Sequence, residues 1–239
     1  MPSPRIMWIT GASSGIGRSL AQISVFHGDT VVASARRKSQ LEDLKKEVSA
    51  SSGLCQICPC DVGDESQVAS VAEIILKEFG HVDVLVNCAG VTYFKDFTGT
   101  TTEEFDELIR TNLRGLFLTT KSVLPDMLKR GTGIVMNILS YAGKATYTGS
   151  SAYAAAKAGA EAMMNVLRAE TRDKGIKIAN VSPGAVLTSI WHPRHQERYG
   201  HIMMKPAEIA KVLYDISLQP ASMMIEDIII RPQVGDLKV

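Results

Sequence analysis

The sequence predicts an α/β fold in which one parallel, doubly wound sheet of about seven strands carries helices on both faces. Three observations support this prediction. Short apolar runs alternate with longer helical patterns along the chain. A glycine-rich turn, Gly11 to Gly17, joins the first apolar run to the first helical pattern. The length of 239 residues suits one large domain with a substantial core, so we expect a single domain over residues 1–239.

Seven apolar runs are the expected strands. Polar residues or glycine bound each of them, and their lengths suit strands that are buried in a parallel sheet. The expected strands are Arg5 to Thr10, Thr30 to Ser34, Leu54 to Cys60, Val82 to Val86, Gly133 to Ser140, Lys177 to Val181 and Ile225 to Arg231.

Helical patterns fill most of the intervals between these runs. The expected helices are Ser19 to Phe26, Lys38 to Ala50, Glu65 to Phe79, Thr101 to Lys129, Ser150 to Lys174 and Pro206 to Gln219. The segment from Thr101 to Lys129 is either one long helix or a bent pair, because Asn112 has poor helix propensity and lies inside it. A kink that frees a backbone carbonyl at this point would explain the asparagine.

The composition excludes several function classes. Hydrophobic residues make up 45% and charged residues 21% of the chain, as in ordinary globular proteins. A net charge of +1 gives no general attraction to nucleic acid or to anionic membranes. No apolar run approaches the ~18 residues of a membrane span. The apolar run after Met1 to Arg5 is too short for the core of a signal peptide, so we expect a cytoplasmic protein.

The cysteines raise the question of a metal site. Cys55, Cys58 and Cys60 form a C-x2-C-x-C cluster, but no nearby His or second Cys pair completes the four ligands that zinc prefers. The cluster lies in an expected strand, where a free cysteine behaves as a small apolar side chain. We therefore expect no metal, and a reducing compartment in which thiols stay free.

The glycine turn suggests phosphate binding. A helix N-terminus presents free N–H groups and the positive end of the helix dipole, and glycines permit close approach of a ligand. The spacing here is GxxxGxG, at the first strand–helix junction, where Rossmann-type sheets bind the phosphates of a dinucleotide.

The residues at the end of the second expected strand indicate which dinucleotide the protein binds. An acidic residue there would bind the 2′-hydroxyl of NAD, but this chain has Arg36 and Arg37. Guanidinium groups match a 2′-phosphate in charge and in donor geometry. We therefore predict NADP(H) as cofactor, with Arg36 as the main contact. The alternative is a solvated basic turn before the next helix.

Three side chains suggest proton transfer. Ser140 ends the fifth expected strand, and Tyr153 and Lys157 lie one turn apart on one face of the next helix. A free phenol titrates near pH ~10, and a neighbouring ammonium lowers its pKa toward neutrality. We expect Tyr153 to exchange a proton with an alcohol or carbonyl, Lys157 to lower the pKa of Tyr153, and Ser140 to hold the substrate oxygen. Alternatively, an isolated Tyr-x-x-x-Lys is a packed tyrosine beside a solvated lysine.

These three residues resemble the active site of the short-chain dehydrogenase/reductase family, of the NADP(H)-preferring type. Five further stretches match that family in the same order over most of the chain. They are Thr10 to Gly17, Asp61-Val62, Asn87 to Gly90, Asn112, and Pro183-Gly184 followed by Thr188. Cys88 departs from the pattern, since the family usually has a second asparagine at this position.

The resemblance implies an oxidoreductase that acts on CH–OH donors and interconverts a carbonyl and a secondary alcohol with NADP(H). It implies a catalytic set of Asn112, Ser140, Tyr153 and Lys157, in which Asn112 holds a water that links Lys157 to solvent. Together with the residues derived above, the expected cofactor-binding set is Gly11, Ser13, Ser14, Gly15, Ile16, Gly17, Arg36, Arg37, Asp61, Val62, Asn87, Ala89, Gly90, Tyr153, Lys157, Pro183, Gly184, Val186 and Thr188.

The substrate is a small molecule of open identity. Residues 189–205 show little periodicity and lie where family members carry a substrate-covering loop, although an exposed mobile loop is an equal alternative. Their aromatic and basic residues could favour an aromatic or an acidic substrate, so a small hydroxy acid and a ketone or aldehyde both stay open. We expect no nucleic-acid or membrane partner. The resemblance implies a homo-oligomer, a tetramer or a dimer.

Two other functions compete with this interpretation. One is an NAD-dependent alcohol dehydrogenase of the same family, which differs only in cofactor preference. The other is a non-catalytic sensor or scaffold that binds NADP(H). The complete Asn–Ser–Tyr–Lys set argues against the second, because a binding protein has no evident need for all four residues.

Overall fold

The computed structural model describes residues 4–237. Residues 1–3 and 238–239 lie outside the described residues, and so do those parts of the sequence expectations that fall on them. Seven parallel strands form one sheet in the order β3-β2-β1-β4-β5-β6-β7. The strands are β1 (Ile6–Thr10), β2 (Thr30–Ser34), β3 (Leu54–Ile57), β4 (Val84–Asn87), β5 (Gly133–Ile138), β6 (Ile176–Pro183) and β7 (Asp227–Ile230). The predicted fold class, a doubly wound parallel sheet of Rossmann type, is confirmed.

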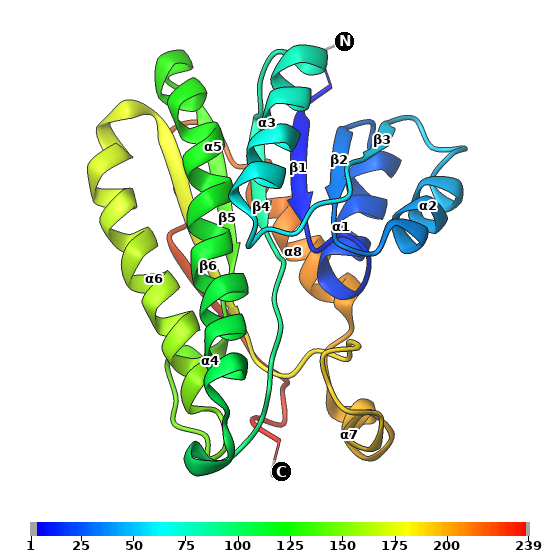
Figure 1. Cartoon of the computed structure of the whole chain (residues 1–239). Coiled ribbons are helices and arrows are strands. Elements are labelled where there is room, and N and C mark those ends of the chain that lie inside the picture. The colour runs from blue at the N-terminus through cyan, green and yellow to red at the C-terminus, as the bar shows by residue number, and fades with distance from the viewer. Residues whose placement is uncertain (1–3, 238–239) are drawn as a thin grey trace.

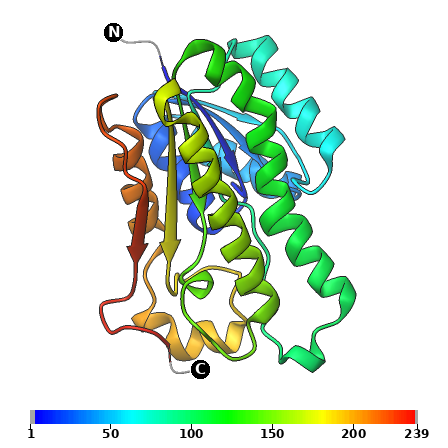
Figure 2. The same cartoon turned by 90° about the vertical axis from the view of Figure 1, so that its left-hand side faces the viewer.

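Helices cover both faces of the sheet (Figures 1 and 2). They are α1 (Gly15–Phe26), α2 (Lys38–Glu47), α3 (Glu65–Phe79), α4 (Thr102–Ile109), α5 (Gly115–Arg130), α6 (Ser151–Thr171), α7 (Pro193–Tyr199) and α8 (Pro206–Ser217). Of the two alternatives for residues 101–129, the pair of helices is confirmed. A π-helical turn, Arg110–Arg114, separates α4 from α5.

The alternation of side chains along β1 divides the core into two layers. Met7 and Ile9 pack with α1, α2 and α8 on one face of the sheet. Trp8 points to the opposite face and packs with α3, α5 and α6. All three side chains are fully buried, as expected for a central strand covered on both sides.

The order of the strands places the site. β1 pairs with β2 on one side and with β4 on the other, so the chain changes direction across the sheet between them. In open parallel sheets, ligands bind outside the carboxyl ends of the strands at such a switch point. The carboxyl ends lie toward the lower edge of Figure 1, the edge at which α7 also lies.

The segment between β6 and α8 differs from the expectation of a loop. Residues 193–199 form α7, and the 3₁₀ turn Gly200–Ile202 follows it. Pro193 starts the helix, and the His192 ring accepts a hydrogen bond from the backbone N–H of Arg194. A first-turn proline and a side-chain cap stabilise a helix without apolar periodicity, which is why the pattern did not reveal it.

The cysteines, the possible metal ligands and the helix lengths bear on metal binding and on membrane insertion. Cys55, Cys58, Cys60 and Cys88 are free thiols. Within residues 4–237, no group of three or more His, Cys, Asp or Glu side chains could hold a metal ion. None of the described helices is both long and apolar enough to cross a membrane.

Candidate active site

The glycine turn connects β1 to α1 at the carboxyl end of the sheet. Gly11 and Gly15 have φ angles of +68° and +58°, which favour glycine. A Cβ on Gly17 would lie 2.6 Å from the carbonyl oxygen of Gly11, closer than van der Waals contact permits. The turn therefore packs tightly enough to expose the backbone N–H groups at the start of α1, where an anion can bind.

Thr10 fixes this turn against the end of β4, a role that sequence reasoning did not assign to it. Its hydroxyl accepts hydrogen bonds from the backbone N–H of Cys88 (3.1 Å) and of Ala89 (3.2 Å). The same hydroxyl donates to the carbonyl oxygen of Val86 at 3.2 Å. A hydroxyl at the end of an otherwise apolar strand was the available signal.

Arg36 and Arg37 follow β2 and behave differently. Nη2 of Arg37 donates to Oγ of Ser13 (3.2 Å) and of Ser14 (3.1 Å), so Arg37 lies against the glycine turn. The Arg36 side chain is 56% exposed, and its Nη1 lies 3.4 Å from Oε1 of Glu107 in α4. Arg37 therefore stands beside the start of α1, whereas the exposed Arg36 faces Glu107 of α4.

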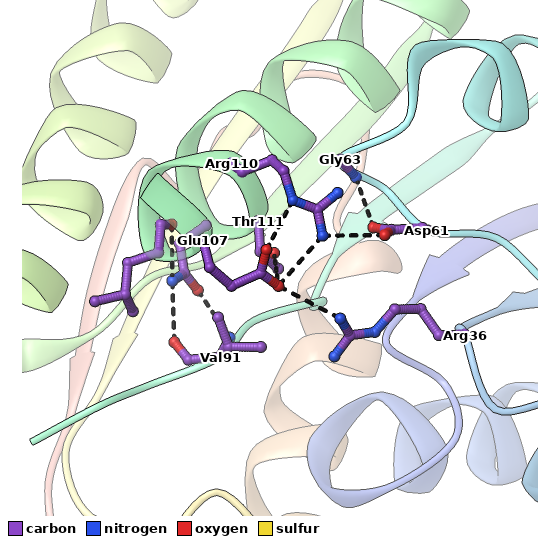
Figure 3. Close-up of polar contacts among 9 residues, drawn as sticks. Arg36, Asp61, Gly63, Val91, Glu107, Arg110 and Thr111 are labelled. Atoms are coloured by element: carbon purple, nitrogen blue, oxygen red, sulfur yellow. Dashed lines mark hydrogen bonds and ion pairs between the residues drawn. The ribbon is translucent and has the colours of Figure 1, made fainter. Parts of the chain in front are cut away.

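Asp61 lies beyond β3 in a small network of charged groups (Figure 3). Its carboxylate accepts hydrogen bonds from Nη2 of Arg110 and from the backbone N–H of Gly63, both at 3.0 Å. Arg110 also donates to Glu107, at 2.7 Å from Nε and at 3.2 Å from Nη2. Sequence reasoning missed Glu107 and Arg110, although an acid–base pair three residues apart immediately before Asn112 was visible.

A row of buried amides crosses the sheet from Asn87. The side-chain nitrogen of Asn87 donates to Asn137, whose own amide donates to Asn180, each at 3.0 Å. The three residues are register partners on β4, β5 and β6. This row satisfies polar groups within the sheet and fixes the end of β4, from which Ala89 and Gly90 continue.

Asn112 lies in the π-helical turn and binds the loop after β4. Its side-chain nitrogen donates to the carbonyl oxygens of Val91 (2.9 Å) and Leu108 (3.1 Å). Its side-chain oxygen accepts from the backbone N–H of Val91 at 3.2 Å. A Cβ on Gly90 would lie 2.8 Å from that oxygen and 3.7 Å from Nζ of Lys157, so Asn112, Gly90 and Lys157 are neighbours.

Ser140, Tyr153 and Lys157 converge at the carboxyl end of β5. The Ser140 hydroxyl caps the 3₁₀ turn Tyr141–Gly143 by accepting from the N–H of Ala142 at 3.1 Å, and it also hydrogen bonds with Tyr153. Nζ of Lys157 donates to the carbonyl oxygen of Ile138 at 2.8 Å. Tyr153 and Lys157 are buried, with 8% and 6% of their surface exposed.

The electrostatics of this trio differ from the expectation in one respect. We expected Lys157 to lower the pKa of Tyr153, but burial raises that pKa, and the opposing contribution comes from the hydrogen bond with Ser140. Nζ of Lys157 lies 5.8 Å from the centre of the Tyr153 ring and is engaged with Ile138. Burial also lowers the pKa of Lys157 to about 8, since an ammonium loses hydration there.

Comparison with known proteins decides the family. Residues 5–199 match the sequence model of the short chain dehydrogenases. The chain belongs to the short-chain dehydrogenase family. The resemblance inferred from the sequence motifs is thus confirmed.

The relatives of this short-chain dehydrogenase are named after several different enzyme activities. The chain is 33% identical to the sepiapterin reductase of Chlorobaculum tepidum, over 98% of both chains. It is 34% identical, over 97% of its length, to the glycine betaine reductase of Emericella nidulans, but it spans only 19% of that protein. The solved alcohol dehydrogenase of Thermococcus sibiricus, complexed with 5-hydroxy-NADP, superposes with a TM-score of 0.90 at 26% identity, covering 99% of this chain and all (100%) of that one.

The loop after β6 packs against the glycine turn of this short-chain dehydrogenase. The backbone N–H of Gly184 donates to the carbonyl oxygen of Ile230 at 2.7 Å, and Val186 forms a parallel bridge with Met204. The methyl group of Thr188 would lie 3.0 Å from a Cβ on Gly15. Thr188 therefore lies against the glycine turn, Val186 against the segment 189–205, and Gly184 against the end of β7.

One cavity of about 920 Å³ joins these parts of the short-chain dehydrogenase fold. Every predicted site residue lines it except Gly17, Asn87 and Asn112, which lie behind the lining residues. Its wall runs from Arg36 and Asp61 at one end, past the glycine turn, to Tyr153 and the segment 189–205 at the other. An extended ligand in this cavity would thus contact the basic end and the Ser–Tyr–Lys end together.

The end of the cavity at Tyr153 and the segment 189–205 is rich in aromatic side chains. Phe94, from the loop after β4, stacks on Trp191 with ring centres 5.3 Å apart and contacts Tyr153 edge-on at 6.1 Å. Of the basic side chains in the segment 189–205, His195 lines the cavity, but Arg194 and Arg198 do not. The guanidinium of Arg198 lies over the Tyr199 ring instead.

Residues after β7 complete this wall, which sequence reasoning did not foresee. Asp236 and Leu237 line the cavity. The Asp236 carboxylate pairs with Arg231 at 2.8 Å and accepts a hydrogen bond from the Tyr147 hydroxyl. The Arg231 guanidinium lies 4.3 Å from the centre of the Tyr141 ring. The segment 232–237 is thereby tied to the loop that precedes the helix of Tyr153.

Proposed function

We propose that this protein is an NADP(H)-dependent oxidoreductase that interconverts a carbonyl and a secondary alcohol. The observation that carries the proposal is the single cavity that joins a basic, glycine-walled end to Ser140, Tyr153 and Lys157. The family supports an oxidoreductase, and the Thermococcus sibiricus relative was solved with an NADP analogue. An NADP-linked reaction on a CH–OH group is the finer function that these observations favour.

The residues present fit a dinucleotide with a 2′-phosphate. The free N–H groups at the start of α1 would hold the pyrophosphate, and Arg36 and Arg37 would bind the 2′-phosphate. Asp61 and Val62 would contact the adenine, while Pro183, Gly184, Val186 and Thr188 would surround the nicotinamide. When bound, NADP(H) supplies or accepts the hydride.

In carbonyl reduction the chain itself supplies the proton and the geometry. Ser140 orients the substrate oxygen by a hydrogen bond, and the Tyr153 hydroxyl donates a proton to that oxygen. Raising the Tyr153 pKa by burial keeps the phenol protonated and suited to act as the acid. Lys157 stands behind it, and the contacts of Asn112 with Val91 hold the adjacent loop in place.

Removing the Ser140 hydroxyl should shift the pH profile of alcohol oxidation. The oxidation direction needs Tyr153 deprotonated, and the hydrogen bond from Ser140 lowers the pKa of Tyr153. In Ser140→Ala that pKa rises, so the rising limb of kcat/KM, on the low-pH side of the profile, should move to higher pH, together with a lower maximal rate. The measurement is a pH profile of both proteins. A limb that stays in place, or moves to lower pH, contradicts the assigned contact.

The side chains at the substrate end favour an aromatic or apolar ketone or aldehyde over a small hydroxy acid. Phe94, Trp191 and Leu237 supply apolar surface there, which favours an apolar group, and Asp236 offers no attraction to an anion because its carboxylate pairs with Arg231 at 2.8 Å. We expect a higher kcat/KM for an aryl ketone than for a 2-oxo acid of similar size. The reverse order in an NADPH oxidation assay would restore the hydroxy-acid alternative.

We also propose that copies of this chain associate with one another and that the protein works in a reducing compartment. The helices α4, α5 and α6 expose Phe105, Phe117 and Val166, each more than 40% accessible. Apolar residues exposed in this way suit an interface between copies of the chain, in a dimer or a tetramer. The four free thiols suit the cytoplasm. Light scattering during size-exclusion chromatography measures the assembly directly.

The experiment that tests the cofactor is a fluorescence titration with NADPH and with NADH. We expect tighter binding of NADPH, and loss of that preference in Arg36→Asp, because the substitution replaces a cation by an anion at the adenosine end. Tighter binding of NADH would overturn the NADP(H) assignment and favour an NAD-linked enzyme. Binding of neither cofactor would favour a function outside the family's chemistry.

A further inference from the structure

Glu107 holds the Arg36 guanidinium at the adenosine end of the cavity. The two side chains come from different parts of the fold, Arg36 from the loop after β2 and Glu107 from the last turn of α4 (Figure 3). Their nearest atoms, Nη1 and Oε1, lie 3.4 Å apart. Arg36 lines the cavity, whereas Glu107 does not, so the carboxylate acts on a ligand through the arginine.

The Glu107 carboxylate is anchored and cannot follow Arg36 toward a ligand. Arg110 donates to both of its oxygens, at 2.7 Å and 3.2 Å, and the Thr111 hydroxyl donates to Oε1 at 3.1 Å. These hydrogen bonds hold the pKa of Glu107 below its usual range, and those from Arg110 contribute most. Glu107 therefore carries a negative charge at neutral pH. Arg36 is the more exposed partner, with 56% of its side chain exposed against 24% for Glu107.

The formal charges of the four ionised side chains in this network cancel. Arg36 and Arg110 are positive, and Asp61 and Glu107 are negative, so these four side chains sum to zero. Arg37 is the remaining cation described above at the adenosine end of the cavity, and it is hydrogen bonded to Ser13 and Ser14. A 2′-phosphate would therefore meet Arg36 already partly neutralised by Glu107. An uncharged 2′-hydroxyl would respond much less to that charge, because Glu107 does not line the cavity and so does not reach the hydroxyl directly.

We propose that Glu107 is a specificity-determining residue that limits the preference of this enzyme for a 2′-phosphorylated dinucleotide, acting through its contact with Arg36. The inference rests on the proposed use of NADP(H) and adds a residue to it. Glu107 sets the balance between NADPH and NADH, and Arg110 and Thr111 hold it in position to do so. Its removal strengthens the binding of the phosphorylated cofactor.

The test is the ratio of the dissociation constants for NADH and NADPH. Glu107→Gln keeps the shape of the side chain and removes its charge, and we expect the ratio to rise about threefold to tenfold in favour of NADPH, as for a partly screened charge. The change should vanish in the Arg36→Ala background. In displacement titrations, Glu107→Gln should bind adenosine 2′,5′-bisphosphate more tightly than the wild type does, by a similar factor. Its affinity for adenosine 5′-monophosphate should not change.

Matched variants separate this role from a structural one. Asp106→Asn removes a charge from an exposed position of the same helix, where no described side chain pairs with Asp106, and should leave the ratio unchanged. Glu107→Asp retracts the carboxylate and should give an intermediate ratio, which keeps the test available if Glu107→Gln does not fold. Thermal melting monitors folding of each variant.

The outcomes distinguish the two proposals. If the wild type prefers NADPH and Glu107→Gln leaves the ratio unchanged or lowers it, the role of Glu107 is wrong and the proposed function stands. An equal rise in the Arg36→Ala background would also overturn the role of Glu107. If the wild type binds neither cofactor, or prefers NADH, the proposed function itself fails.

Discussion

Tyr153→Phe is expected to lower kcat about a hundredfold to ten-thousandfold, the usual contribution of a positioned acid or base. The substitution removes one hydroxyl from a side chain that is 8% exposed, so the packing around the ring is retained. Without the phenol, Ser140 can still hold the substrate oxygen, but the proton must come from water. Steady-state turnover with NADPH and a ketone substrate measures the loss, while the affinity for NADPH should change much less.

Tyr214 provides the matched control. It is also a tyrosine with 8% exposure, but it lies in α8 beneath the Arg5 guanidinium and does not line the cavity. Tyr214→Phe should therefore lower stability slightly and leave turnover close to wild type. Turnover near wild type in Tyr153→Phe would exclude Tyr153 as the proton donor, and an equal loss in both variants would point to a general effect of removing a buried hydroxyl.

Gly17→Ala should weaken dinucleotide binding at least tenfold and destabilise the fold by about 1–3 kcal/mol, as overpacking usually does. The added Cβ would lie 2.6 Å from the carbonyl oxygen and 2.9 Å from the carbonyl carbon of Gly11. These are backbone atoms, so the contact can be relieved only by moving the turn. That movement would displace the N–H groups at the start of α1 that we assign to phosphate binding.

Gly99→Ala is the control for adding a methyl group at a glycine. Gly99 has no positive φ angle, and its Cβ would meet nothing within 4 Å among the described residues. Denaturant unfolding and NADPH titration should show little change in this variant. If Gly17→Ala behaves like Gly99→Ala in both measurements, the tight packing of the glycine turn is not what shapes the binding site.

Sequence reasoning succeeded where the pattern was local. The bounds of β2 and α3 agree with the predicted ones, because apolar runs and a capping residue define them within a few positions. The convergence of Ser140 with Tyr153 also followed from local spacing, since a strand end and the next helix of a parallel sheet meet at one edge. The interruption at Asn112 was foreseen from its poor helix propensity, although not its π-helical form.

The missing parts depend on contacts between distant segments. The pairing of Arg36 with Glu107 joins the loop after β2 to α4, and the bond from Tyr147 to Asp236 joins a mid-chain loop to the residues after β7. Neither contact has a sequence signature. The pKa of Tyr153 also depends on burial, which the spacing of Tyr153 and Lys157 does not reveal.

The segment that follows β7 has a consequence for how such enzymes diverge. The family match ends at residue 199, yet Asp236 and Leu237 line the same cavity as Ser140, Tyr153 and Lys157. We expect substitutions at these two positions to change the shape and charge of this end of the cavity while leaving the glycine turn and strands β1 to β4 untouched. We therefore expect related enzymes to differ at this end of the cavity through a few residues near the C-terminus.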